Sequence, residues 1–157
     1  MDIDAERARV GAQEHALCGA PRGADAAWQL GCRLREAAQA RGAALAIEVR
    51  LAGHTVFFHA MPGTAPSHAD WVRRKRNTAE WHGTSSYAVA LAMRAAETTL
   101  HDKTGLPVRD YAAYGGSVAL RSEDGVVWGS ATVSGLAQRE DHELLVEVLL
   151  DWIGAAA

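Results

Sequence analysis

Several features that define whole classes of protein are scarce or missing in this sequence. Only two cysteines occur, Cys18 and Cys32, and neither belongs to a CxxC motif, so the sequence predicts two free thiols. No apolar run approaches the roughly 20 residues that a membrane-spanning helix needs. The first ten residues, MDIDAERARV, carry acids where a signal peptide would carry a basic and then an apolar segment. We therefore expect a cytoplasmic protein without a membrane partner.

An excess of positive charge is also missing, as are the common motifs of metal and nucleophilic sites. Sixteen Lys and Arg residues against nineteen Asp and Glu give a net charge of −3, which argues against a dedicated nucleic-acid binder. The seven histidines form no HxxxH or HExxH pattern, so we expect no metal site. Neither GxSxG nor SxxK surrounds Ser85 and Ser86, whose expected role is to cap a helix.

What the sequence does contain is typical of one globular domain. Its 157 residues, 48% hydrophobic and 22% charged, are enough to enclose a proper core. No repeat, linker or low-complexity segment divides the chain. We therefore expect a single domain over residues 1–157.

The spacing of apolar residues predicts the order of the elements. Two helices precede a first hairpin, two more helices follow it, and a second hairpin leads into a last helix. These helices are expected at about residues 4–18, from a cap at Asp25 to a stop at Gly42, from a capping box at Ser67 and Asp70 to Gly83, over the apolar run 87–96, and at about 139–153. The stretch LHDKTGLP, residues 100–107, is expected to be a loop.

Two hairpins fix the fold class. Ile47, Val49 and Leu51 alternate with charged residues and are followed across an AGH turn by TVFFHA. SVALR and VVWGSATV flank SEDG, in which Asp-Gly is a strong hairpin signal. Because hairpins pair antiparallel, the sequence predicts an α+β fold in which helices pack on one antiparallel sheet, with SEDG linking adjacent strands.

The segment DWVRRKRN places four consecutive cations, residues 73–76, in an acidic protein. On a helix these cations spread over about 300° of the circumference, so they cannot all face one ligand. Three interpretations remain open: cations in solvent, a subunit interface, or an anion-binding site that uses the planar donors of Arg73 or Arg74. Acids at the start of the last helix are the natural partners, and we predict that Arg73, Arg74 or Lys75 pairs with Glu140 or Asp141.

One histidine and one glycine pair are further candidates. His142 lies on the apolar stripe of the last helix with Leu145, Leu149 and Trp152, where it is either a core histidine or an imidazole lining a pocket. Tyr114-Gly115-Gly116 precedes a strand and permits either a bend or a ligand contact.

Four segments taken together resemble the haem-degrading-domain family, which includes HbpS-like and GlcG-like proteins, and in particular its uncharacterised cytosolic branch. They are ADWVRRKRN, SSYAVAL, YAAYGGSVALR and VSGLAQREDHELLVE, in this order from residue 69 to residue 147. The resemblance extends from about Gly11 into the last helix. It implies a profilin-like α/β/α sandwich that forms dimers or larger oligomers and binds haem or a related tetrapyrrole.

The resemblance also marks a set of positions. They are Trp71, Arg73, Arg74, Lys75, Asn77, Ser85, Ser86, Tyr87, Gly115, Gly116, Ser134, Gly135, Glu140, Asp141 and His142. This chain departs from the family pattern at two places, with Tyr114 where the family commonly has His and with Trp81-His82 where it commonly has Arg-Phe. Tyr114 and His82 are residue types that ligate iron.

Three hypotheses for function follow. The first is an oligomeric domain that binds an anionic ligand such as haem. The second is an enzyme acting on a small acidic substrate, with His142 as acid or base in a cleft shared with one free cation. The third is a protein-interaction module. Five Trp residues, with Trp71 beside the cations and Trp128 on a strand, predict an apolar surface that a second copy covers in a homodimer or larger oligomer.

Overall fold

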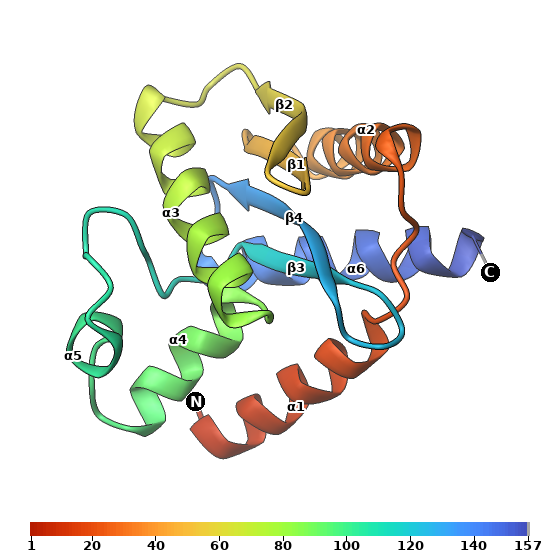
Figure 1. Cartoon of the computed structure of the whole chain (residues 1–157). Coiled ribbons are helices and arrows are strands. Elements are labelled where there is room, and N and C mark those ends of the chain that lie inside the picture. Colours follow the sequence, from red (N-terminus) through yellow and green to blue (C-terminus); the bar gives the residue numbers. More distant parts are fainter. Residues whose placement is uncertain (157) are drawn as a thin grey trace.

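The computed structural model describes residues 1–156, which form six helices around one four-stranded sheet (Figure 1). In chain order the elements are α1 (Ile3–Ala16), α2 (Ala24–Ala40), β1 (Ala46–Leu51), β2 (His54–Ala60), α3 (Pro66–His82), α4 (Ser86–Ala95), α5 (Leu100–Thr104), β3 (Ser117–Arg121), β4 (Val127–Ser134) and α6 (Gln138–Ala156). None of the helices within residues 1–156 is long and apolar enough to cross a membrane.

Both predicted hairpins lie in a single antiparallel sheet with the strand order β2-β1-β4-β3. The first hairpin turns at Ala52 and Gly53, which both have positive φ, as a two-residue turn between twisted strands requires. The second turns at SEDG, where Gly125 has a φ of 85° and its N–H donates to the carbonyl of Ser122 at 2.9 Å. The predicted α+β class is confirmed.

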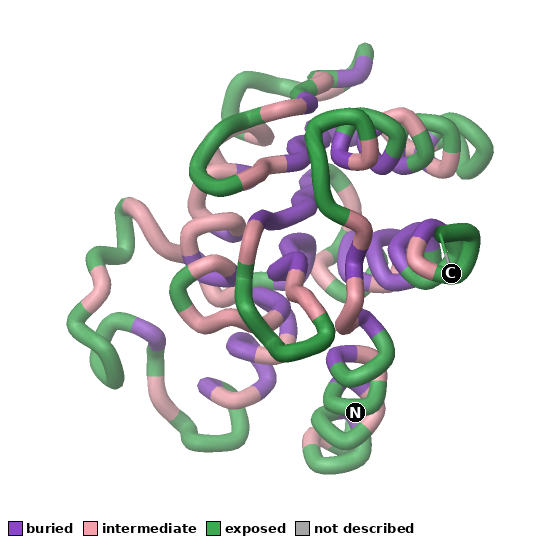
Figure 2. The backbone as a smooth tube through the Cα atoms, turned by 45° about the vertical axis from the view of Figure 1, so that its right-hand side comes forward, coloured by how far each residue is buried: buried purple, intermediate pink, exposed green. Residues whose placement is uncertain are grey.

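Helices cover the sheet on both faces, so the molecule is the α/β/α sandwich that the family resemblance implies (Figure 1). α2 and α6 pack together on one face, and α3 crosses the other. α1 lies beside α4 rather than on the sheet. Figure 2 shows buried residues along the strands and on one side of each long helix.

The strands alternate so that the two faces differ in polarity. Ile47, Val49 and Val133 point toward α2 and α6 and belong to the main apolar core. Glu48 and Thr132, which are paired across the sheet, point toward α3 and are also buried. Thus one interior layer is apolar and the other is polar.

Two local expectations are wrong. Residues 100–104 form α5 instead of a loop, because the Thr99 side chain caps the turn and Gly105 ends it in the left-handed region. The capping box at Ser67 and Asp70 does not form, because α3 already begins at Pro66. The N–H of the N-cap residue Ala65 instead donates to His68 Nδ1 at 2.9 Å.

Candidate functional site

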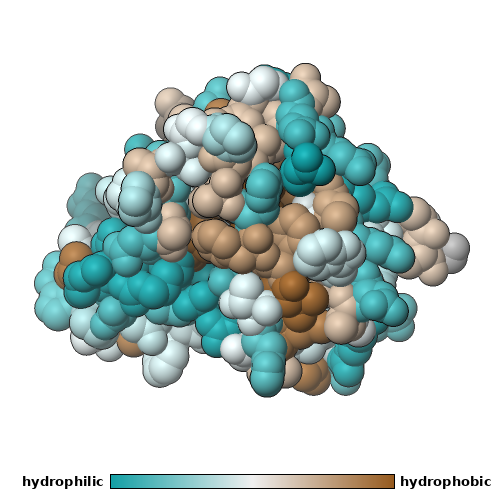
Figure 3. Space-filling model, turned by 90° about the horizontal axis from the view of Figure 1, so that it is seen from above, coloured by the Kyte–Doolittle hydropathy of each residue, from teal (hydrophilic) through white to brown (hydrophobic). Residues whose placement is uncertain are grey.

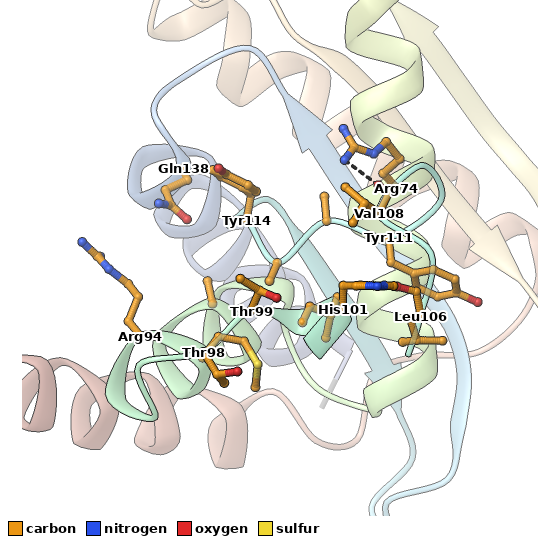
Figure 4. A pocket seen from close by; sticks show the side chains of 15 residues that line it. Arg74, Arg94, Thr98, Thr99, His101, Leu106, Val108, Tyr111, Tyr114 and Gln138 are labelled. Atoms are coloured by element: carbon orange, nitrogen blue, oxygen red, sulfur yellow. Dashed lines mark hydrogen bonds between the residues drawn. The ribbon is translucent and has the colours of Figure 1, made fainter. Parts of the chain in front are cut away.

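A cavity of about 520 Å³ lies between α3, α4, α5 and the segment that leads into β3 (Figure 4). Its walls combine apolar side chains with a few polar ones. The lining residues include Arg74, Met93, Leu100, His101, Leu106, Tyr111 and Tyr114. A volume of this size lies within the range typical of sites for small molecules and cofactors.

Arg74 is the cation of the run that lines this cavity. Its guanidinium lies over the Trp71 ring, 4.6 Å from the centroid. Its Nη2 donates to the carbonyl of Val108 at 2.8 Å, the hydrogen bond dashed in Figure 4. Trp71 in turn packs edge-on against Tyr114 at a centroid distance of 5.3 Å. Among the described residues no carboxylate pairs with Arg74, and its buried Nε has no hydrogen-bond partner. The guanidinium therefore places at the cavity wall a positive charge that no carboxylate among the described residues neutralises.

The neighbouring cations have other partners. Arg73 pairs with Asp110 at 2.8 Å and with Asp70 at 3.2 Å. Arg76 extends from α3 toward the sheet and pairs with buried Glu48 of β1 at 2.9 Å. Asn77 does not line the cavity, since its amide donates to the carbonyl of Asp110 at 3.0 Å. The run therefore divides into cations that hold α3 in place and one that faces the cavity.

Lys75 and Asp141 form the ion pair that the sequence predicts between α3 and the start of α6. Nζ lies 3.0 Å from Oδ2, and both side chains are almost wholly buried. Lys75 also donates to the carbonyl of Val133 and to Ser134 Oγ, each at 3.3 Å, and Asp141 accepts from the Leu136 N–H at 3.0 Å. Burial lowers the pKa of Lys75 and raises the pKa of Asp141, each against the attraction of the other. The pair is structural.

The two glycines of the YGG segment allow close backbone contacts. A side chain at Gly116 would lie 2.7 Å from the Lys75 ammonium nitrogen, and one at Gly115 would lie 2.2 Å from the carbonyl oxygen of Gln138. The N–H of Gly115 donates to the Gln138 side chain at 3.1 Å. Gly116 also has a φ of 129°, in the region that favours glycine. These contacts explain both glycines without a ligand.

His142 does not line this cavity, so the cavity gives no support to the hypothesis of His142 as acid or base in a cleft shared with a free cation. Its side chain is wholly buried between α1 and α4. Nε2 lies 2.9 Å from Gln13 Oε1, and the ring packs against Tyr87. Burial lowers the pKa of His142 from 6.5 to about 4, so the imidazole is neutral near pH 7.

Tyr87 is likewise buried and faces away from the cavity. Its hydroxyl donates to Glu6 Oε1 at 3.0 Å. Glu6 also pairs with Arg9 and Arg139, and the hydrogen bond from Arg9 is the largest reason why its pKa falls to about 2. This cluster ties α1 to α4 and α6.

Four further predicted residues have structural partners of their own. The Ser85 side chain caps α4 by accepting from the N–H of the third residue of α4 at 3.1 Å, as predicted. Ser86 Oγ accepts from the Ser117 N–H at 3.0 Å. His82 Nδ1 lies 3.0 Å from the carbonyl oxygen of Thr78, and exposed Glu140 accepts from a backbone N–H of its own turn at 3.2 Å. Of the predicted ligand-binding residues, only Arg74 and Tyr114 line the cavity.

Sequence reasoning missed the other half of the cavity. His101 lines it from the stretch expected to be a loop, and Tyr111 lies just after that stretch, whereas Arg94 lines it from the helix predicted over residues 87–96. The signal that was available is the spacing Thr99-x-x-Asp102, which caps a short helix through a hydrogen bond from the Asp102 N–H to Thr99 Oγ1 at 3.1 Å. Recognising α5 would have placed His101 on an ordered element.

Comparisons with known proteins agree with this fold. The family model described as "Haem degrading protein HbpS-like" matches residues 23–149. A UPF0303 protein of Paraburkholderia phymatum is 51% identical over 154 residues, covering 98% of this chain and 93% of that protein. UPF0303 protein YE1367 of Yersinia enterocolitica is 47% identical over 133 residues, covering 85% of this chain and 79% of that protein.

Solved structures show the same arrangement. The Ybr137w protein superposes with a TM-score of 0.87 at 26% identity, covering 96% of this chain and 88% of that one. The PduOC:haem complex gives a TM-score of 0.69 at 19% identity, covering 82% and 91%, which is evidence of shared fold alone. Since the family model spans most of the chain and close relatives match nearly all of it, the chain belongs to the family of haem-degrading, HbpS-like proteins.

Proposed function

We propose that this chain is an oligomeric domain that binds a planar anionic ligand, haem or a related tetrapyrrole, in the cavity beside α5. The observation that carries the proposal is the combination of apolar walls with a guanidinium, that of Arg74, which has no carboxylate partner among the described residues. A ligand with an apolar body and an acidic edge matches both features.

The residues present fit such a group. Met93, Leu100 and Leu106 supply apolar contact, and Arg74 offers planar donors suited to a propionate. Tyr111, Tyr114 and His101 supply the phenol and imidazole groups that hold haem iron in proteins. Membership of an HbpS-like family, and a fold neighbour that forms a haem complex, support the same ligand class.

Titration of the purified protein with haem, followed by its Soret band, tests the proposal. Arg74→Gln should weaken binding by about tenfold, because a charge-assisted hydrogen bond to a propionate is lost. Arg73→Gln is the matched control, since Arg73 is adjacent on α3 but pairs with Asp70 and Asp110 outside the cavity. A wild-type protein that gives no Soret shift at micromolar haem would sink the proposal.

We also propose that the chain forms a homodimer or larger homo-oligomer through the face that carries the edge strand β2. β2 contains no Asp, Glu, Lys or Arg, and monomeric proteins commonly place such charges on edge strands. Phe58 on β2 and Trp28 on α2 are 46% and 55% exposed. Figure 3, seen from the side of β2, shows hydrophobic surface at the centre of this face with hydrophilic surface around it. Light scattering should show more than a monomeric mass at micromolar concentration, and Phe58→Glu should lower it.

A further inference from the structure

The imidazole of His101 is held in one defined tautomer. Its Nδ1 lies 3.0 Å from the carbonyl oxygen of Leu106. A carbonyl oxygen only accepts hydrogen bonds, so Nδ1 carries the proton and the lone pair of the neutral ring is on Nε2. Within the described residues Nε2 has no hydrogen-bond partner. His101 therefore keeps its basic nitrogen free in a residue that lines the cavity.

The carbonyl that sets this tautomer is itself fixed. Leu100 is buried against α4 and anchors α5. Thr104 Oγ1 donates to the Leu100 carbonyl at 2.6 Å and accepts from the N–H of Leu106 at 3.2 Å, and Gly105 turns the chain between them with a φ of 74°. His101 and its acceptor thus belong to one compact turn whose geometry does not depend on the ligand.

This arrangement is the one that metal-bound histidines show. A ligating imidazole usually donates its other N–H to a carbonyl or carboxylate, which orients the ring and raises the basicity of the ligating nitrogen. The hydrogen bond alone does not identify a ligand. His82 Nδ1 also lies 3.0 Å from a carbonyl oxygen, that of Thr78, but His82 does not line the cavity. Only His101 combines the fixed tautomer with a place in the cavity wall.

The two tyrosines in the cavity are held differently. Tyr114 packs edge-on against Trp71, and Tyr111 packs edge-on against Trp81 at a centroid distance of 6.4 Å. These contacts orient the rings, but no hydrogen bond within the described residues activates either hydroxyl. A phenol must lose its proton to bind iron well, whereas the free nitrogen of His101 is already unprotonated in this tautomer.

We propose that His101, through Nε2, is the protein's iron ligand for haem in this cavity, with the Leu106 carbonyl as the group that sets its tautomer. The inference rests on the proposed function, since it assigns a role within the same cavity. It adds a ligand from α5 that neither Tyr114 nor His82 supplies.

The experiment compares ferric haem with metal-free protoporphyrin IX, which fills the same space without a ligand bond. Binding of each is measured for the wild type, His101→Ala and His82→Ala, together with the electron paramagnetic resonance and resonance Raman spectra of the haem forms. His101→Ala should lose the histidine–iron signature and weaken haem binding by about tenfold or more, while protoporphyrin binding, which loses only a wall contact, should weaken far less. Added imidazole should restore the signature, and His82→Ala should match the wild type.

The possible failures are distinguishable. If the wild type binds both porphyrins but His101→Ala leaves the haem spectrum unchanged, the ligand assignment is overturned while the proposed function stands. If the wild type binds neither porphyrin, both fail. Because His101 is exposed on the cavity wall, its replacement should leave the circular dichroism spectrum and melting temperature of the protein unchanged, and these serve as the folding control.

Discussion

On one face of the sheet α2 and α6 meet aliphatic side chains, and on the other α3 meets charged and hydroxyl side chains. Leu34 and Leu145 pack with Ile47 and Val133 in the first layer, all wholly buried. Each such side chain contributes roughly 1.5–3 kcal/mol by leaving water. The same strands supply the second layer from their alternate residues, so the difference lies in side chains and not in backbone.

The polar layer consists of linked pairs. Glu48 accepts from Arg76 at 2.9 Å, and Glu80 accepts from Ser130 at 2.8 Å and lies 3.6 Å from Arg50. Ion pairs in such buried or partly buried positions add little net stability, because desolvation offsets their attraction. These ion pairs form only when α3 lies in its observed position, because a shifted helix would leave charged side chains without partners. We infer that the apolar layer stabilises the fold and that the polar layer fixes α3, and with it Arg74.

The largest expected effect on the free energy of unfolding comes from breaking the buried ion pair of Lys75 and Asp141, which joins α3 to the start of α6. Lys75→Met should lower the free energy of unfolding by about 4 kcal/mol at pH 7, because Asp141 then keeps a buried charge without a counter-ion. Urea denaturation of the variant and the wild type measures the change.

The control for this prediction is the double variant Lys75→Met/Asp141→Asn, which removes both charges and keeps an oxygen for the Leu136 N–H. It should recover more than half of the loss. If Lys75→Met alone has nearly wild-type stability, the pair is not isolated from water. The polar layer would then contribute no more than ion pairs on the protein surface.

A somewhat smaller effect is expected in the apolar layer. Leu145→Ala should lower the free energy of unfolding by about 3 kcal/mol, because it removes buried contact and leaves a cavity between α6 and the sheet. Leu150→Ala on the same helix is the matched control, since Leu150 is 38% exposed, and it should cost less than about 0.5 kcal/mol. Equal losses at the two positions would mean that α6 is held by something other than its apolar stripe.

The two layers also differ in how much of their structure can be predicted from the sequence. The apolar layer can be predicted from two patterns, the alternation of Ile47, Val49 and Leu51 and the apolar stripe of α6. Hydrophobic burial is non-directional, so the correct period is enough. The pair of Lys75 with Asp141 follows from charge, since a cation run must meet acids. The cavity does not follow, because it depends on where α5 places His101 relative to Arg74, two residues that no local pattern relates. His142 shows another limit, since its place on the apolar stripe leaves a core histidine and a pocket-lining imidazole both open and cannot show that its neighbours are Gln13 and Tyr87.

The smallest effect is a dependence on pH that comes from His142, which packs against α1 and α4 and lies outside both layers. His142 has a pKa of about 4 in the folded protein and an ordinary value of 6.5 when unfolded, because burial disfavours its charged form. As pH falls below 6.5 the unfolded chain binds a proton that the folded chain refuses, so stability is fully present above that pH and is lost progressively toward pH 4. Between pH 7 and pH 5 the loss from this group is about 2 kcal/mol.

His142→Gln isolates that contribution. Gln keeps an N–H that can donate to Gln13 Oε1 but cannot titrate, and every other ionisable group, including Glu6 and Asp141, is common to both proteins. The fall in the free energy of unfolding from pH 7 to pH 5, measured with urea, should therefore be about 2 kcal/mol smaller in His142→Gln than in the wild type. Leu145→Ala should keep the wild-type pH dependence, because the apolar layer binds no proton. An identical fall in His142→Gln and wild type would mean that His142 is already charged, or solvated, in the folded state.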